Sequence, residues 1–293
     1  MKRHRCVPLR RCSRRVSALW RKIALAAFVC SIAFTCTAAE RPAIWIDTDC
    51  SIGAFYREVD DAYALILAFH SPEVRIAGLS TSYGNAGLNR TTQVGRQLVG
   101  LFGGTAGLES EHVFPGAESA QQLGRSTQAS TALARAAQKE RITYVALAPL
   151  TNLAGFLQLH PKLAARIGRV IMVGGKSPGY PLAFGPNDRL RIHDANVFKD
   201  PAAVGIVLAS GIPITLAPIE TSSQLTFDHQ DLRRLRTSSP AGEFLARRSG
   251  VWSWFWTTLV REEGGPVFDL LAVLSAIKPQ LVRTEARSAH LDP

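Results

Sequence analysis

The stretch Ile44-Trp45-Ile46-Asp47-Thr48-Asp49 decides the predicted fold, together with Asp60-Asp61-Ala62 after an interval of ten residues. A short run of Ile and Trp predicts a buried strand, and the apolar residues that follow Asp61 recur at the spacing of a helix. Four carboxylates therefore lie where a strand is followed by a helix. Because ligands of an open α/β sheet bind at the carboxyl ends of its strands, this junction is a candidate functional site.

Two explanations fit these four acids. Carboxylates gathered in one crevice repel each other unless a cation or strong hydrogen-bond donors lie among them, and Ca²⁺, which accepts about 6–8 oxygen ligands, is a simple solution. Alternatively, Asp60 and Asp61 only stabilise the positive end of a helix, and Asp47 and Asp49 are ordinary loop acids.

The positive charge of the chain is concentrated at its start. The 293 residues carry a formal charge of +11, but residues 1–22 hold nine Lys and Arg and no acid. Removing these nine charges leaves +2 for residues 40–293. Such a nearly neutral body gives no reason to expect binding to nucleic acid.

Residues 1–39 have the organisation of a secretory signal peptide. The basic segment is followed by the apolar run 23–37 and by Ala38-Ala39, two small residues suited to cleavage. We therefore predict a signal peptide at 1–39, a single domain at 40–293, and a secreted or periplasmic protein without membrane contact after cleavage. An uncleaved N-terminal anchor is the alternative.

Only one cysteine, Cys50, lies outside the predicted signal peptide. The mature chain is therefore expected to have no internal disulfide, and its core must be stabilised by packing. Because no His is near Cys50 in sequence, we interpret it as a small buried side chain rather than a nucleophile.

Strand-like and helix-like segments alternate along the chain. Further strands are expected at 74–79, 142–147, 169–173 and 212–216, and helices at 91–101, 130–139, 150–159, 201–209, 244–261 and 267–277. The intervening segments 105–126 and 177–192 are expected to be irregular loops. This alternation predicts an α/β fold, with an open, mainly parallel sheet that has helices on both faces, in a single domain.

Polar segments follow several of the predicted strands. They are Gly84-Asn85, Ala148-Pro149-Leu150-Thr151-Asn152-Leu153-Ala154, Val173-Gly174-Gly175, His193-Asp194-Ala195-Asn196 and Gly265-Pro266-Val267-Phe268-Asp269. Singly, each has a structural explanation: Gly84-Asn85 suits a tight turn, and Asp269 suits the first turn of a helix. In this order, after D-T-D and D-D-A, they resemble the nucleoside hydrolase family. The resemblance extends from Ile44 to Val273.

The resemblance implies a Ca²⁺-dependent hydrolase that cleaves the N-glycosidic bond of ribonucleosides to give base and ribose. Its partner would be a small nucleoside, and a homo-oligomer is left open. The implied ligands of Ca²⁺ are Asp49, Asp61, Asp269 and the backbone carbonyl of Leu147, with Asp49 also the catalytic base. The implied sugar-binding residues are Asp60, Asn85, Asp194, Asn196 and, by a looser match, Asp188. We expect Thr151 and Asn152 to cap a helix, and Asp200-Pro201 to begin one.

The sequence departs from the family where the leaving base is expected. Pyrimidine-accepting members have a His before the last Asp, where this chain has Phe268. The family has a second His in a mid-chain motif, and the corresponding region of this chain, 119–125, contains no His. Trp252, Trp256 and Phe268 are candidates for stacking on a base, although most such aromatics are core residues. The interval Cys50–Val59 is longer than in the family, and we expect a flap over the site.

Two functions from different classes follow. The first is the hydrolase described above. The alternative is a ribose- or nucleoside-binding homologue that has lost turnover, because the leaving-group His residues are absent. A phosphohydrolase that uses D-x-D is a weaker third hypothesis, since the sequence offers no phosphate-binding Gly loop.

Overall fold

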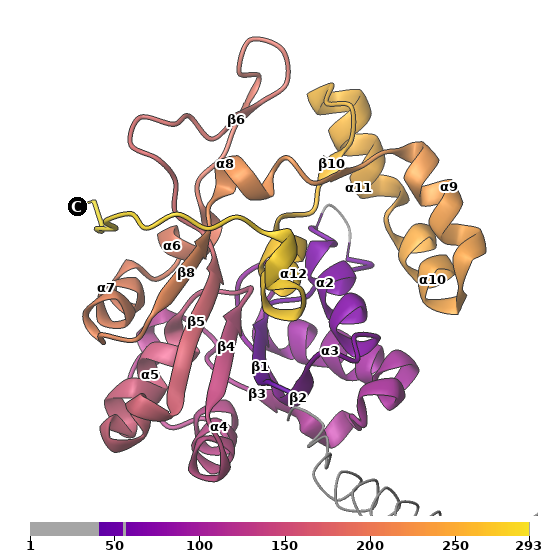
Figure 1. The fold of residues 1–293 in the computed structure, drawn as a ribbon. Helices are drawn as coiled ribbons and strands as arrows, with labels where there is room; N and C mark the ends of the chain where they lie inside the picture. The colour runs from indigo at the N-terminus through magenta and orange to yellow at the C-terminus, as the bar shows by residue number, and fades with distance from the viewer. Residues whose placement is uncertain (1–40, 55–56, 293) are drawn as a thin grey trace, which may run out of the picture. The chain divides into compact units, whose positions relative to one another are not determined.

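The computed structural model describes residues 41–54 and 57–292 (Figure 1). The predicted signal peptide at 1–39 lies outside the described residues. Among the described residues, no helix combines the length and the apolar character that crossing a membrane requires.

A six-stranded parallel sheet organises residues 41–292. Its strand order is β3-β2-β1-β4-β5-β8, and every neighbouring pair is parallel. The strands are β1 (Ala43–Thr48), β2 (Arg75–Thr81), β3 (Val113–Pro115), β4 (Ile142–Ala146), β5 (Ile167–Val173) and β8 (Ile214–Ala217). Because all six run the same way, their carboxyl ends meet at one edge, which confirms the predicted fold class.

Helices cover both faces of this sheet (Figure 1). One apolar core forms with α2 (Asp60–Phe69), α3 (Leu88–Phe102) and α12 (Phe268–Ile277). A second core forms on the other face with α4 (Gln128–Lys139), α5 (Thr151–Leu159) and α7 (Pro201–Ala209). Strand alternation explains this division, since Ile44 and Ile46 of β1 enter the first core and Trp45 enters the second.

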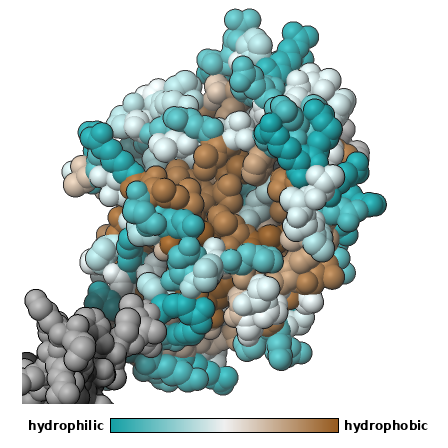
Figure 2. All heavy atoms as spheres, turned by 45° about the vertical axis from the view of Figure 1, so that its right-hand side comes forward, coloured by the Kyte–Doolittle hydropathy of each residue, from teal (hydrophilic) through white to brown (hydrophobic). Residues whose placement is uncertain are grey.

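Smaller elements complete the described chain. The short helices are α6 (Ala195–Phe198) and α8 (Ile219–Ser222), and the longer ones are α9 (His229–Ser238) and α10 (Pro240–Arg248). Two-stranded antiparallel pairs are formed by β6 (Ala183–Phe184) with β7 (Leu190–Arg191), and by β9 (Thr226–Phe227) with β10 (Gly265–Pro266). Figure 2 brings forward the side of the molecule on which α9 and α10 lie. Apolar side chains gather in a hollow on this side, and hydrophilic side chains surround them.

The predicted elements agree with the structure except where elements are short or interrupted. The segment 105–126 contains β3, which is only three residues long, and 177–192 contains the hairpin of β6 and β7. The single helix predicted at 244–261 is wrong. It is divided into α10, α11 (Gly250–Trp254) and a π-helix at Phe255–Val260. Gly250, a poor helix residue, begins the second segment, which accounts for the break after α10.

Trp45 of β1 packs closely against Gly78 of β2. The two residues are paired in register, and the Trp45 ring lies over the glycine, so that a Cβ at position 78 would come 2.3 Å from Trp45 Cζ3. Trp45 Nε1 also donates a hydrogen bond to Ser80 Oγ at 2.8 Å. The ring therefore has little freedom to move away.

We predict that Gly78→Ala destabilises the protein by about 1–3 kcal/mol through overpacking against Trp45. Chemical denaturation would measure the change in unfolding free energy. Gly205→Ala is the matched control, because position 205 lies in α7 with nothing within 4 Å of the added Cβ. The control should be neutral or stabilised by about 0.5–1 kcal/mol, as for Gly→Ala in a helix. Equal stability of the two variants would contradict the prediction.

Candidate active site

Three buried aspartates converge at the carboxyl edge of the sheet. Asp60 and Asp61 open α2, and Asp269 lies in the first turn of α12, which packs against α2. Each of the three offers a carboxylate oxygen within 4.8 Å of the others, and none is more than 4% exposed. The Asp269 N–H also donates to Asp60 Oδ2 at 3.4 Å. The positive ends of two helix dipoles thus face this group of acids and partly offset its charge.

Asp49 extends this group from the end of β1. Its N–H donates to Asp61 Oδ1 at 3.2 Å. Asn85, in the loop after β2, links the two acids, since its Nδ2 lies 3.1 Å from Asp49 Oδ1 and 3.3 Å from Asp61 Oδ2. Its backbone N–H donates to Asp49 Oδ2 at 2.8 Å. We call Asp49, Asp60, Asp61 and Asp269 the acid cluster.

Gly84 makes this arrangement sterically feasible. A Cβ at position 84 would lie 1.6 Å from Asp49 Oδ2, well inside contact distance. Only glycine therefore lets the backbone after β2 approach the Asp49 carboxylate closely enough for the Asn85 N–H to bind it. The Gly84-Asn85 pair, for which a tight turn is the simplest interpretation from sequence, has a direct role in holding the acid cluster.

Burial raises the pKa of every member of the acid cluster. The pKa of Asp49 and that of Asp60 rise from an ordinary value of 3.8 to about 7, first through loss of solvation, with the charge of neighbouring carboxylates adding to it. The pKa values of Asp61 and Asp269 are raised well above the ordinary range for the same reasons. Four ionised carboxylates are therefore unfavourable here without a positive charge among them.

The acid cluster fits a hard divalent cation. Its donors are all carboxylate oxygens, the ligand type that Ca²⁺ and Mg²⁺ prefer. Asp60 Oδ1 is buried and has no hydrogen-bond partner among the described residues, which is costly unless a ligand binds it. Leu147, the predicted carbonyl ligand, directly follows β4, and its carbonyl accepts a hydrogen bond from Asn196 Nδ2 at 3.1 Å.

The predicted sugar-binding residues lie in different environments. Asn196 joins the ends of two strands, donating to the carbonyls of Leu147 and, at 3.2 Å, Val173. Asp194 caps α6, and its carboxylate accepts the N–H groups of Gly175 at 2.5 Å and Val197 at 3.3 Å. Asp188 is about half exposed and pairs with Arg191 at 3.4 Å. Asn196 and Asp194 thus belong to the carboxyl edge, whereas Asp188 belongs to the projecting 174–194 segment.

Asp47 lies on the opposite side of β1 from Ile46, in a hydrogen-bond network that the sequence did not reveal. Its Oδ1 accepts bonds from Ser80 Oγ at 2.6 Å and from Asn152 Nδ2 at 2.8 Å. Asn152 Oδ1 in turn accepts the Ala117 N–H at 2.8 Å. Asp47 therefore fastens β1 to β2 and α5, directly behind the acid cluster.

The expectation that Thr151 and Asn152 cap a helix is wrong. Both are inside the first turn of α5, and its N-cap, Leu150, makes no side-chain bond. Thr151 Oγ1 instead donates to Asp200 Oδ2 at 2.5 Å, because a strong acceptor from a distant segment is within reach. Asp200 and Pro201 do begin a helix, as predicted, with Asp200 Oδ1 accepting the Ala203 N–H.

Comparison with known proteins identifies the family. Residues 44–292 match the family described as inosine-uridine preferring nucleoside hydrolase. This chain belongs to the nucleoside hydrolase family. The family predicted from the sequence is therefore confirmed.

Several known proteins are similar to this nucleoside hydrolase along most of its length. Pyrimidine-specific ribonucleoside hydrolase RihA of Citrobacter koseri is 26% identical, over 78% of this chain and 79% of that protein. Probable uridine nucleosidase 2 of Arabidopsis thaliana is 28% identical, over 83% and 79%. Among solved structures, a plant nucleoside hydrolase superposes with a TM-score of 0.69 at 25% identity, covering 83% of this chain and 80% of that one. A purine-preferring ribonucleoside hydrolase from Gardnerella vaginalis has the same fold, with a TM-score of 0.68 at 23% identity and coverage of 83% and 82%.

The candidate base-stacking residues of this nucleoside hydrolase are mainly core residues. Trp252 is buried, and its Nε1 donates to Glu58 Oε2 at 2.9 Å. Trp256 is 2% exposed and packs edge-on against Phe184 of β6, with ring centroids 5.1 Å apart. Phe268 is only partly buried, 6.3 Å from the same Phe184 ring. Of the three, only Phe268 is not fully buried, and it directly precedes Asp269.

The described ends of the Cys50–Val59 loop pack into the protein. Cys50, Ile52 and Val59 are buried in the core. Burial raises the pKa of the Cys50 thiol well above its ordinary value, which keeps it protonated and favours its interpretation as a buried filler. Residues 55 and 56, at the centre of the expected flap, lie outside the described residues.

We predict that Ca²⁺ stabilises this nucleoside hydrolase more at pH 8 than at pH 5. Asp49 and Asp60 have folded-state pKa values of about 7, above their ordinary value of 3.8, so folding favours their neutral forms. Their contribution to the free energy of unfolding is fully present below pH about 4 and is lost as the pH rises to about 7. A cation binds the ionised carboxylates and restores the stability that is lost at high pH.

Thermal unfolding with saturating Ca²⁺ and with a chelator, at both pH values, would measure the difference. Na⁺ at matched ionic strength is the control for general screening. An equal rise in melting temperature at pH 5 and pH 8 would count against a cation bound by these carboxylates.

Proposed function

We propose that this protein hydrolyses the N-glycosidic bond of ribonucleosides, releasing base and ribose, and that it depends on Ca²⁺. The acid cluster carries the proposal, because four buried carboxylates have the composition of a cation site and lie at the carboxyl edge of a parallel sheet, where ligands of such sheets bind. Membership of the nucleoside hydrolase family supports the reaction class.

Residues of the acid cluster would bind the cation and supply the general base. The cation would be held by Asp49, Asp61, Asp269 and the Leu147 carbonyl. When bound, it supplies positive charge that polarises a water molecule and orients the sugar hydroxyls. Asp49 has a pKa of about 7 in the cation-free protein and accepts the proton of the attacking water as general base.

The remaining polar residues would position the sugar. Asp60 Oδ1 has no partner among the described residues and can accept a hydroxyl hydrogen bond. The Asn85 amide contacts Asp49 and Asp61, and the Asn196 amide contacts the Leu147 carbonyl, so both lie beside proposed cation ligands. Asp194 would complete the set. Holding the ribose in a fixed geometry lowers the entropic part of the barrier to attack at its anomeric carbon. The departing base would lie against Phe268, which is only partly buried.

Incubation with inosine, uridine and p-nitrophenyl riboside tests the proposal. Reducing sugar should be released from at least one of them with Ca²⁺, and release should stop with a chelator. Tight binding of a nucleoside without release would instead favour the alternative of a binding protein without turnover. That alternative is less favoured, since the similar curated proteins are named as hydrolases.

We predict that Asp49→Asn lowers kcat by about 10²–10⁴, the usual contribution of a general base. The substitution removes one charge from a repulsive group, so the cation-free variant should unfold at a temperature no lower than the wild-type protein. Kinetics and thermal unfolding together would separate lost chemistry from lost folding. Glu111→Gln is the control, because Glu111 is an exposed acid, and it should keep wild-type kcat. Wild-type kcat in Asp49→Asn would exclude Asp49 as the base.

We also propose that the protein is exported, with residues 1–39 removed. The basic and apolar composition of those residues supports this. N-terminal sequencing of the protein recovered outside the cytoplasm should begin at Glu40.

A further inference from the structure

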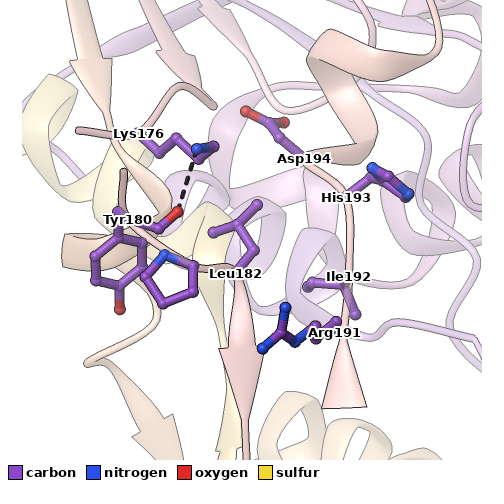
Figure 3. Close-up of a pocket in the computed structure, with 8 residues that line it drawn as sticks. Lys176, Tyr180, Leu182, Arg191, Ile192, His193 and Asp194 are labelled. Carbon is purple, nitrogen blue, oxygen red and sulfur yellow. Dashed lines mark hydrogen bonds between the residues drawn. The ribbon is translucent and has the colours of Figure 1, made fainter. Parts of the chain in front are cut away.

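A cavity of about 350 Å³ lies within the 174–194 segment, between β5 and α6 (Figure 3). The hairpin of β6 and β7 belongs to the same segment. The cavity walls combine apolar and positively charged side chains, which are Lys176, Tyr180, Pro181, Leu182, Arg191 and Ile192. This size and mixture suit a small polar ligand group.

Two cations border the cavity. Lys176 Nζ donates to the Tyr180 carbonyl at 3.1 Å, which holds the ammonium at the rim (Figure 3). The Arg191 guanidinium makes one 3.4 Å contact with Asp188 and remains 73% exposed, so most of its five N–H donors are available. The neighbouring His193 ring instead stacks on Phe198, with centroids 4.8 Å apart. Lys176 and Arg191 are therefore the two positive charges of the cavity, against the single carboxylate of Asp194.

Asp194 connects the cavity to the sugar side of the proposed site. It lines the cavity, yet both of its carboxylate oxygens accept backbone N–H groups, from Gly175 and Val197. Two residues later, Asn196 bonds the carbonyls at the ends of β4 and β5. The cavity thus adjoins the carboxyl edge through Asp194 and Asn196, the latter bonded to the carbonyl of Leu147, a proposed cation ligand.

Lys199 supports this placement. Its carbonyl accepts a hydrogen bond from the Tyr83 hydroxyl at 3.2 Å, and Tyr83 directly precedes the Gly84-Asn85 pair that holds Asp49. Its backbone N–H donates to the Ala195 carbonyl at 3.1 Å, next to Asp194 of the cavity wall. A sugar that spans from Asp49 past Asn196 would therefore point its end remote from the reacting carbon toward Lys176 and Arg191. In a ribose, that end is the 5′ carbon.

Resting on the proposed function, we propose that this cavity binds a phosphate group on the 5′ carbon of the ribose, and that the substrates are ribonucleoside 5′-monophosphates. Water adds across the N-glycosidic bond: its oxygen joins the anomeric carbon, and its proton goes to the departing base. The products are the free base and ribose 5-phosphate, and the phosphate ester stays intact.

Ligand binding tests the cavity without relying on turnover. Calorimetric titration of the full protein with ribose 5-phosphate, ribose and inorganic phosphate should show ribose 5-phosphate binding on the order of tenfold or more tighter than ribose. The advantage should shrink as salt is raised. Equal affinity for ribose and ribose 5-phosphate would overturn the proposal. Equal affinity for inorganic phosphate and ribose 5-phosphate would overturn the link between cavity and sugar.

Charge removal tests the two cations. Lys176→Gln and Arg191→Gln should each reduce the preference for ribose 5-phosphate over ribose on the order of tenfold. Arg191→Lys should lose less, because it keeps the charge. Arg233→Gln, an exposed cation of α9, is the matched control and should keep the wild-type preference. An unchanged preference in both cavity variants would overturn the assignment.

Turnover distinguishes this proposal from the proposed function. The ratio of kcat/KM for uridine 5′-monophosphate to that for uridine should exceed one and fall in both cavity variants. Cleavage of uridine with a ratio of one or less would overturn the substrate class and leave the nucleoside hydrolase function intact. If neither compound is cleaved, the proposed function fails, and the titrations still decide whether the cavity binds the sugar phosphate.

Discussion

Repulsion among buried carboxylates is the constraint on which the rest of the site depends. Two like charges 4 Å apart repel by about 4 kcal/mol even at an effective dielectric constant of about 20. The acid cluster places oxygens of Asp60, Asp61 and Asp269 within 4.8 Å of each other, with Asp49 bonded to Asp61. Such a group persists only because a rigid framework holds it, and this framework is made by β1, α2 and α12. A bound cation would relieve the repulsion between these charges.

The framework is fixed both within β1 and just beyond its end. Asp49, the first residue after the strand, is held by Asn85 and Asp61. Asp47, inside the strand, bonds Ser80 and Asn152 and ties β1 to β2 and α5. The strand thus provides the anchor, and the residue that follows it belongs to the acid cluster. Movement of β1 relative to its neighbours would disturb both sets of bonds, so the geometry of the carboxylates is coupled to the core of the sheet.

The sequence predicted the site best for residues that are close to each other both in the chain and in space. Asp49, Asp60 and Asp61 stand at a strand end and a helix start, so local pattern alone brings them near each other. Asp269 was placed with them only by the family resemblance, because α12 lies 209 residues from its hydrogen-bond partner Asp60. The strand and helix alternation was sufficient for the sheet, although β3 has too few residues to give a periodic pattern.

Long-range pairing explains what the sequence did not show. Asn152 has the residue type of a helix cap, but its partner Asp47 lies 105 residues away, and that contact decides its role. Trp252 and Glu58 are 194 residues apart, so their bond was not visible in either segment. Whether Trp256 faces a ligand or the core depends on Phe184, a residue from the projecting hairpin. Residue type restricts such contacts, but only the folded chain selects among them.

The absence of a side chain at Gly84 also limits how this protein can diversify. Because any Cβ there would overlap the Asp49 carboxylate, the backbone beside the acid cluster tolerates almost no variation. The hairpin between β5 and α6 is restricted in this way only at Gly185, where a Cβ would lie 2.2 Å from the Val260 carbonyl oxygen, whereas its charged residues Asp188 and Arg191 are exposed. Relatives with new ligand preferences are therefore expected to differ in the length and charge of that hairpin while retaining glycine before the asparagine.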